Sequence, residues 1–367
     1  MKKIIHLLGT RGLPASHGGF ETFVANLAPF LTDKGWDVRV YCQRLGSGPI
    51  TEEAYRGFTL INVPVLGNGT KSTIVFDWLS LRYALRAEGI LLSFGYPTGI
   101  FAILPRILKR CHIVNMDGIE WKRSQFGWIG RIALYVNERF AAYFANHLIA
   151  DHPEIEKHLS TRVRVGKVST IAYGAPLIES ADVDKLKLVG VEAEKFAVVI
   201  ARPEPDNSIL EIIRAFSGQN SDLNLVILGA LSSTNKYHND LIKAANEKVI
   251  FPGAIYDSSL LAALRKYCRF YIHGHRVGGT NPSLVEALGA GSAVLAHDNK
   301  FNRWVTNNSS IYFTNVEEMR EKIEELAKDD VLISRLRLAS QTEHHSRFSW
   351  EKILSEYHDL LFNFASK

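Results

Sequence analysis

The stretch Tyr271–Asp298, YIHGHRVGGTNPSLVEALGAGSAVLAHD, joins an apolar run, a glycine-containing loop, a helical pattern and a second apolar run. Asn281 and Pro282 stand where the helix should begin, because Asn is a favoured N-cap and Pro is favoured at the first helical position. Two apolar runs separated by one helix are typical of a β-α-β unit with parallel strands. The stretch therefore predicts part of a doubly wound α/β sheet.

The same alternation extends in both directions from this stretch. Apolar runs alternate with helical patterns from FAVVI (196–200) onward, and the first half opens with KKIIHLLG, an amphipathic segment and WDVRVYC. Residues 173–195 mix Gly, Pro and charge without a clear period, and they separate the two series. We predict two Rossmann-like, doubly wound domains, residues 1–175 and 190–345, followed by a last helix over 350–367. Ligands should bind at the carboxyl ends of the strands, across a shared cleft.

Composition narrows the class of protein. The 367 residues are 46% hydrophobic and 22% charged, which is typical of a globular chain with room for two cores. The three cysteines lie far apart and outside any CxxC spacing, so a disulfide framework or zinc site is not indicated. A net charge of +5 is too mild to indicate a nucleic-acid partner. No apolar run approaches the roughly 20 residues that cross a bilayer, and the N-terminal run is too short for a signal peptide. We expect a cytoplasmic protein.

The glycine loop and the helix after it predict an anion site. A helix that starts after such a loop presents unpaired backbone N–H groups, and each interaction there is worth about 0.3–1 kcal/mol, or up to about 2 kcal/mol when partly buried. A diphosphate would need a cation as well, and Arg202, at the end of FAVVIAR, is placed to supply it. For His273 the pattern leaves two interpretations, a ligand contact or a core histidine with its hydrogen bonds satisfied.

Glu286 lies one turn into this helix and also allows two interpretations. Glu is a good helix former on a solvated face. A carboxylate near a nucleotide can instead accept hydrogen bonds from ribose hydroxyls.

Three segments resemble a known family. GGTNPSLVEALGAG, GGFETFVANLAPFLTDKGWDVRVY and FSWEKILSEYHDLL resemble the family 4 retaining glycosyltransferases of the GT-B fold, and LLGTRGLPASHGGFETF and NMDGIEWKRSQFG resemble their bacterial rhamnosyltransferase branch. The resemblance covers nearly the whole chain. It implies a GT-B architecture whose C-terminal helix returns to the N-terminal domain. It also implies transfer of L-rhamnose from dTDP-rhamnose, with retention, onto a lipid-linked precursor of capsule, O-antigen or another bacterial polysaccharide.

The resemblance also implies a donor site. Arg202 would bind the donor diphosphate, and Glu286 would be the second Glu of the family's Glu, seven residues, Glu motif. Gly278 occupies the position of the first Glu, and Asn207 stands where many relatives have Lys. Loss of the first Glu removes two acceptor oxygens from the sugar pocket and favours a donor of different stereochemistry or with a deoxy position. The donor-binding candidates are Gly18, Gly19, Arg202, His273, Gly279, Thr280, Asn281, Ser283 and Glu286.

On the acceptor side, Asp117 follows the expected strand in HIVNMDG and should face the same cleft. It could orient or deprotonate an attacking hydroxyl, although a turn residue in Asp-Gly is the alternative. Asp117 and Arg202 are the catalytic candidates. Arg11, His17 and Glu120 are further acceptor-side candidates.

Two further segments bear on metal and membrane contacts. Asp182 and Asp184 form a DxD pattern, but no expected strand precedes it, so chance explains it better than a metal site, and we expect no essential metal or cofactor. The segment 126–149 is rich in aromatic residues with interspersed Arg. Core packing is the favoured explanation for it, and peripheral contact with anionic lipid is the alternative.

Other functions remain open at this point. A transferase of the same fold could use a UDP- or GDP-sugar, and a nucleotide-sugar epimerase would use the same donor site. A non-catalytic sugar-nucleotide sensor is the alternative outside enzymes. A nicotinamide dehydrogenase is weaker, because the first loop lacks GxGxxG.

Overall fold

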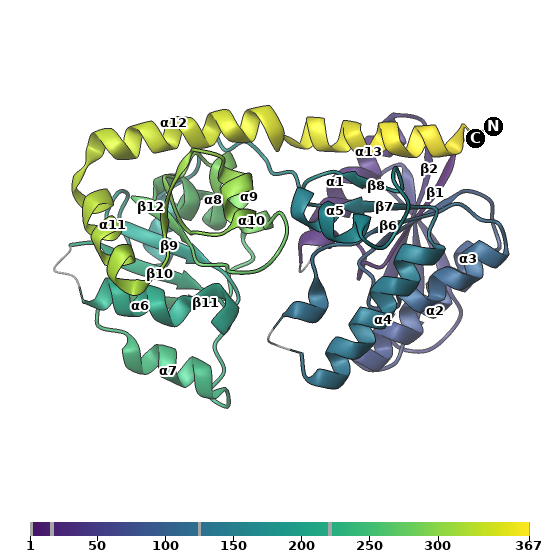
Figure 1. The fold of residues 1–367 in the computed structure, drawn as a ribbon, viewed down its shortest axis with the longest axis horizontal. Helices are drawn as coiled ribbons and strands as arrows, with labels where there is room; N and C mark the ends of the chain where they lie inside the picture. The colour runs from purple at the N-terminus through teal and green to yellow at the C-terminus, as the bar shows by residue number, and fades with distance from the viewer. Residues whose placement is uncertain (1–2, 15–17, 124–125, 219–221, 367) are drawn as a thin grey trace. The chain divides into compact units, whose positions relative to one another are not determined.

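The computed structural model describes residues 3–14, 18–123, 126–218 and 222–366, and they form two compact α/β units (Figure 1). Unit 1 contains the chain up to residue 122 together with residues 126–172 and 351–367. Unit 2 is built mainly from residues 173–350. The two-domain, Rossmann-like fold expected from the sequence is confirmed.

Unit 2 holds a parallel six-stranded sheet in the order β11-β10-β9-β12-β13-β14. Counted along the chain, this is the 3-2-1-4-5-6 order of dinucleotide-binding folds. Its strands are β9 (Phe196–Ile200), β10 (Asn224–Leu228), β11 (Val249–Gly253), β12 (Phe270–His273), β13 (Val294–His297) and β14 (Ser310–Phe313). Its helices are α6 (Ile209–Ser217), α7 (Lys236–Ala244), α8 (Ser258–Tyr267), α9 (Pro282–Gly289), α10 (Lys300–Thr306), α11 (Val316–Lys328) and α12 (Asp330–Arg347), with the short 3₁₀ helices η3 (Val183–Leu188) and η4 (Pro205–Asn207).

Helices cover both faces of this sheet. The side chains of α6 pack into one core cluster with β9, β10 and β12, whereas α8 and α9 lie on the opposite side (Figure 1). Both faces are therefore shielded from water, which explains why the strands are almost continuously apolar.

Unit 1 holds an eight-stranded sheet in the order β3-β4-β2-β1-β5-β6-β7-β8. Its strands are β1 (Ile4–Leu8), β2 (Asp37–Leu45), β3 (Thr51–Tyr55), β4 (Phe58–Val65), β5 (Ile90–Phe94), β6 (His112–Asn115), β7 (His147–Ala150) and β8 (Val168–Thr170). Its helices are α1 (Gly19–Asp33), α2 (Thr70–Ala84), α3 (Ile103–Ile107), α4 (Trp128–Phe144), α5 (Pro153–Ser160) and α13 (Trp350–Ala365), with η1 (Gly99–Ala102) and η2 (Glu120–Lys122).

The edge of this sheet departs from the parallel pattern expected from the sequence. β3 pairs antiparallel with β4 through a two-residue turn at Arg56 and Gly57, both of which have positive φ. That geometry suits the turn that joins two antiparallel strands. The exposed, charged sequence TEEAY gave no apolar alternation by which the strand could be predicted.

One helical expectation also needs correction. Core packing was expected to account for the apolar character of α4, but its buried residues are Glu138, Ala141 and Ala142, and its large apolar side chains are largely exposed. Core packing therefore does not explain why α4 carries so many large apolar side chains.

The C-terminal helix α13 packs within unit 1. The Tyr357 ring lies 4.7 Å from the Phe23 ring of α1, and its hydroxyl accepts a hydrogen bond from Asn115 Nδ2 at 2.6 Å. The Asn115 Oδ1 atom accepts in turn from the backbone N–H of Asp117 at 2.9 Å. The last helix thus supports the loop that carries a candidate catalytic residue.

We expect Tyr357→Phe to lower the free energy of unfolding by about 1–3 kcal/mol, because the buried Asn115 amide loses its acceptor. Urea denaturation measures the change. Tyr143→Phe is the matched control, since Tyr143 is exposed. Equal stability of Tyr357→Phe and wild type would contradict the role assigned to this hydrogen bond.

Candidate functional site

The donor-side candidates of unit 2 gather where the sheet reverses its winding. β9 and β12 are neighbours in the sheet, yet the connections that follow them lead to opposite sides. Side-chain and backbone bonds join the two loops: Ser208 Oγ donates to Gly274 O at 2.8 Å, and the Arg276 N–H donates to Asp206 O at 2.9 Å. In open α/β sheets, ligands bind beside the strand ends at such a reversal.

The start of α9 lies at this reversal and is capped as expected from the sequence. Asn281 is the N-cap, and its side-chain oxygen accepts from Ser283 N–H at 3.0 Å and from Ser283 Oγ at 2.9 Å. Pro282 occupies the first turn. Gly278 has a φ of 148°, and Gly279 and the buried Thr280 complete the loop before the cap. Backbone N–H groups in this first turn can bind an anion.

Arg202 follows β9 and presents its guanidinium largely to solvent. Its side chain is 62% exposed, and Nη1 lies 3.7 Å from Glu204 Oε1, which is a long ion pair. Asn207, which stands where a Lys was expected from the resemblance, is buried and donates to the backbone carbonyl of Arg202 at 2.8 Å. Asn207 therefore holds the loop instead of adding a second cation.

His273 differs from the core histidines of this protein. It is 1% exposed, and in the described part of the chain neither ring nitrogen has a hydrogen-bond partner. His6, by comparison, is buried with Nδ1 3.0 Å from Tyr41 Oη and Nε2 3.0 Å from Glu88 O. The His273 ring stacks on His275 at 4.2 Å between centroids. Unsatisfied buried nitrogens are costly, so the alternative of a core histidine with its hydrogen bonds satisfied does not describe this ring, and a ligand contact stays a prediction.

Burial keeps both stacked rings neutral. It holds the pKa of His273 well below the ordinary value, and it lowers the pKa of His275 to about 3, with smaller contributions from the positive charges of Arg123 and Arg202. A neutral imidazole can donate one hydrogen bond and accept another. The pair can therefore contact a phosphate or hydroxyl oxygen without adding charge.

Glu286 has a role that sequence analysis did not consider. Its Oε2 atom accepts from Nη2 of Arg265, a nearly buried side chain of α8. The carboxylate is therefore not simply solvated on a helix face, and its contact with a ribose stays a prediction. The ion pair fixes its orientation at the α8–α9 contact, and a carboxylate can still accept further hydrogen bonds.

Unit 1 has a cavity of about 220 Å³ at its own reversal, between the ends of β1 and β5. Its aromatic wall includes Phe20, Phe94 and Tyr96. The Asp, Glu, Ser, Thr and His side chains that line it are Thr73, Asp77, Ser93, Thr98, His112, Asp117 and Glu120. Two predicted residues, Asp117 and Glu120, are thus brought together in one cavity wall.

Asp117 has a left-handed backbone, with φ at 51°. Asp is among the residue types that adopt this conformation most readily. Asp117 is therefore a turn residue and also lines the cavity, so the two interpretations do not exclude each other. Glu120 is held nearby, since its backbone N–H donates to Tyr96 Oη at 2.8 Å.

The remaining predicted residues lie elsewhere in unit 1. Gly18 is the N-cap of α1 with φ at 92°, and Gly19 is the first helical residue. Gly18 is thus the position whose backbone requires glycine. The backbone N–H of Arg11 donates to Glu21 Oε1 at 3.0 Å, and its side chain lines a separate groove with Gly12, Pro14 and Arg44. His17 lies outside the described residues.

Asp77 was missed in the sequence analysis. It lies on α2 between Thr73 and Leu81, at i, i+4 and i+8 spacing, and all three line the cavity. Its Oδ2 atom accepts from Thr98 Oγ1 at 2.8 Å, and burial raises its pKa to about 6. The sequence did carry a signal for Asp77: it is a carboxylate on the side of an amphipathic helix that should face the protein interior.

Two general features bear on cofactor and membrane. Among the described residues, no group of three or more His, Cys, Asp or Glu side chains is arranged to hold a metal ion. Across the same residues, no helix is long and apolar enough to cross a membrane.

Solved structures share the whole fold at low identity. Sucrose-phosphate synthase from Thermosynechococcus elongatus matches with a TM-score of 0.83 and 15% identity, covering 100% of both chains. HepE of Anabaena, solved with UDP and glucose, matches with a TM-score of 0.77 and 17% identity over 98% of this chain and 99% of that one. The UDP-forming trehalose-phosphate synthase of Burkholderia xenovorans matches with a TM-score of 0.74 and 10% identity over 98% and 99%. These likenesses establish a GT-B architecture.

The raised pKa of Asp77 predicts a pH-dependent stability. The folded protein holds a proton up to about pH 6, which the unfolded chain releases near its ordinary pKa of about 3.9. This group's contribution is thus greatest below about pH 4 and is lost as pH rises through about 6. We expect the free energy of unfolding of Asp77→Asn, relative to that of wild type, to rise by about 1–2 kcal/mol between about pH 4 and about pH 8. Urea denaturation at a series of pH values measures this difference. Asp33 is exposed, so the stability of Asp33→Asn should change with pH as that of wild type does. If the stability of Asp77→Asn also changed with pH as that of wild type does, the raised pKa of Asp77 would be contradicted.

Family models divide the chain in the same place as the fold. Residues 1–176 match a domain of unknown function (DUF1972), and residues 182–345 match Glycosyl transferases group 1. Comparison with curated proteins finds no match. The second half of the chain thus matches the glycosyl transferases group 1 model, and glycosyl transfer is the activity that this match, together with the GT-B architecture, supports.

Proposed function

We propose that this protein transfers L-rhamnose from dTDP-rhamnose, with retention, onto a lipid-linked precursor of a bacterial polysaccharide such as capsule or O-antigen. The observation that carries the donor part is the unit-2 reversal. There the capped start of α9, the exposed Arg202 and the buried His273 lie at the ends of two neighbouring strands whose loops are joined, and His273 has no hydrogen-bond partner within the part of the chain that the structure describes. A helix start and a guanidinium favour a diphosphate, and a neutral imidazole suits its oxygens or a sugar hydroxyl.

The solved neighbours support a nucleotide sugar as the donor class. HepE was solved with UDP-glucose, and also with UDP and glucose. For this chain, the choice of dTDP-rhamnose depends on the sequence resemblance and on Gly278, which supplies no side chain to a donor sugar. UDP- and GDP-sugars are the competing donors.

The proposed mechanism uses Arg202 and the first turn of α9 on the donor, and Asp117 on the acceptor. The bond between the anomeric carbon and the donor phosphate breaks, and the acceptor oxygen bonds to that carbon from the same face. The leaving phosphate oxygen takes the acceptor proton while Arg202 and the first turn of α9 stabilise its negative charge. Asp117 orients the acceptor hydroxyl from the unit-1 cavity wall. Because cationic and backbone groups bear the charge, we propose that no metal is required.

The acceptor determines where the protein works. A polysaccharide precursor on a lipid carrier is held in the membrane, and nucleotide sugars are supplied from the cytoplasm. We therefore place the reaction at the inner face of the cell membrane, with the protein bound there peripherally.

A thermal-shift screen of dTDP-, UDP- and GDP-sugars tests the donor. We expect dTDP-rhamnose to give the largest rise in Tm, because a ligand at 100 times its Kd adds about 2.7 kcal/mol of stability. Arg202→Ala should lose most of this rise, and Arg214→Ala, an exposed arginine of α6, should keep it. A larger shift with UDP-glucose would replace the proposed donor, and no shift with any nucleotide sugar would overturn the donor site.

Turnover with a lipid-linked acceptor tests the chemistry. We expect Arg202→Ala to lower kcat by about 10²–10³-fold, as removal of one oxyanion-stabilising group does. A chelator should leave the wild-type rate unchanged. Loss of activity in chelator that Mg²⁺ restores would refute metal-free transfer. Steady conversion of the donor to an epimer without acceptor would favour the epimerase instead.

A further inference from the structure

The outer surface of α4 is unusually apolar for a protein face. The Trp128 side chain is 72% exposed, and Ile129, Ile132 and Val136 are 66%, 55% and 40% exposed. Trp128, Ile132 and Val136 repeat every four residues, so they form one stripe along the helix. Single exposed apolar residues need no explanation, but a continuous stripe that includes Trp does.

The apolar surface continues from α4 onto α2 through η1. Asn137 Oδ1 of α4 accepts from the backbone N–H of Ile100 at 2.9 Å, and the Phe101 ring lies 5.2 Å from the Trp78 ring of α2. Ile100 and Trp78 are themselves partly exposed. We call this surface the helical face: it comprises Ile74, Val75, Trp78, Ile100, Trp128, Ile129, Ile132 and Val136, each at least 37% exposed.

Charge on the same two helices is sorted by sign. All residues of α2 and α4 are described, and their exposed charged side chains are Lys71, Arg82, Arg131 and Arg139. The two acids of these helices point inward. Asp77 accepts from Thr98 in the cavity wall, and Glu138 is 1% exposed and bound by Trp121, His158 and Arg162. An ordinary solvated helix surface carries both signs, so this sorting indicates an anionic partner.

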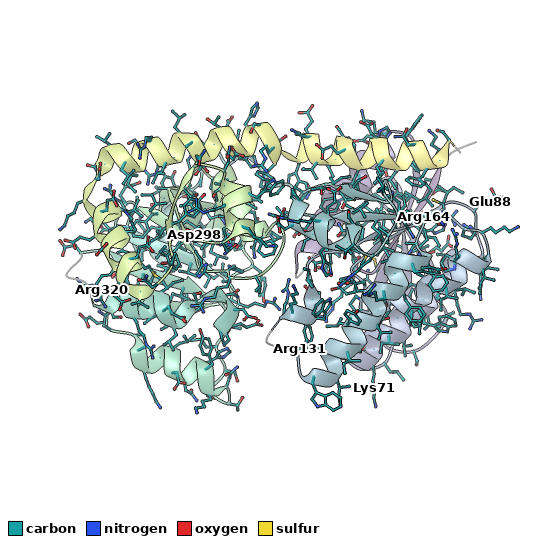
Figure 2. The ribbon with its side chains drawn as sticks, in the orientation of Figure 1. Lys71, Glu88, Arg131, Arg164, Asp298 and Arg320 are labelled. Atoms are coloured by element: carbon teal, nitrogen blue, oxygen red, sulfur yellow. The ribbon has the colours of Figure 1, made fainter. Side chains whose placement is uncertain are left out.

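Figure 2 shows Lys71 and Arg131, from the start of α2 and of α4, at the same end of this helical layer. Arg164 and Glu88 appear well away from them in that view. Basic side chains thus flank the apolar stripe at the end where Trp128 begins α4.

We propose that the helical face docks on an anionic lipid surface. Trp and branched aliphatic side chains insert at the depth of the headgroups, while Lys and Arg stems extend from the same helices to the lipid phosphates. A second copy of this chain fits less well, because an isologous contact would place basic residues against basic residues. The docking rests on this surface alone, and only its purpose, access to a lipid-linked acceptor, rests on the proposed function.

Co-sedimentation with vesicles tests the docking. Wild type should pellet with vesicles of mixed phosphatidylglycerol and phosphatidylcholine, and should remain in the supernatant with pure phosphatidylcholine or at high salt. We expect K71E combined with R131E, and W128S combined with I132S, each to weaken binding at least tenfold. R164E and V331S, at exposed positions outside the helical face, are the matched controls and should bind as wild type does.

Donor thermal shift separates this proposal from the proposed function, since the same variants should keep the wild-type shift with the nucleotide sugar. Equal binding of all variants, or of both vesicle types, would overturn the docking. So would a wild type that is dimeric in solution and becomes monomeric in W128S/I132S, because the face would then be an interface between copies. Vesicle binding without any donor shift would uphold the docking and remove the donor site.

Discussion

Both halves of this protein depend on one topological constraint, the point where a parallel sheet reverses its winding beside the first strand. Right-handed crossovers send the chain to one side of the sheet before that point and to the other side after it. No crossover then covers the strand ends at β1 and β5, or at β9 and β12. Each candidate site, the unit-1 cavity and the joined loops of unit 2, lies at such an opening. Side chains decide what binds there, but the topology decides where.

Close backbone approach is the local condition for these openings. A Cβ at Gly9, directly after β1, would overlap the carbonyl oxygen of Phe94 at the end of β5, and one at Gly274, after β12, would overlap that of Asn207. In unit 2 this approach lets Ser208 and Arg276 join the two loops, which holds the loops that carry His273 and Arg202 together. Contact requires glycine at both positions, and at Gly9, whose φ is 81°, the backbone conformation requires it as well.

The sequence predicted the elements whose signals are local. Alternating apolar runs located the Rossmann-like halves, and Asn281 followed by Pro282 located the start of α9 to the residue. It could not predict partners that come from distant segments. Arg265 of α8 pairs with Glu286 of α9, and Thr98, in the loop after β5, donates a hydrogen bond to Asp77 of α2. Tyr357 accepts a hydrogen bond from Asn115, which lies 242 positions earlier in the sequence. Those contacts determine whether a side chain is a ligand, a support or part of the core, and no spacing within one segment encodes them.

The misassigned helix α4 shows why apolar content alone is ambiguous. A helix rich in Trp, Ile, Tyr and Phe packs in a core when its polar residues are few and face the solvent. In α4, by contrast, the buried residues are Glu138 and two alanines. Small residues let α4 lie close to η1, and an ion pair satisfies the buried carboxylate, so the large side chains are left on the outside. The companion helix α2 shares this pattern only in part: Asp77 lines the cavity and Trp78 is exposed, but Phe76 and Leu81 are buried in the core. Unit 1 thus uses the inner face of α2, together with Ala141 of α4, to line the cavity that holds Asp77, and the outer faces of both helices to present an apolar, basic surface. A substitution on either face of α2 should therefore affect only the function of the face that it changes.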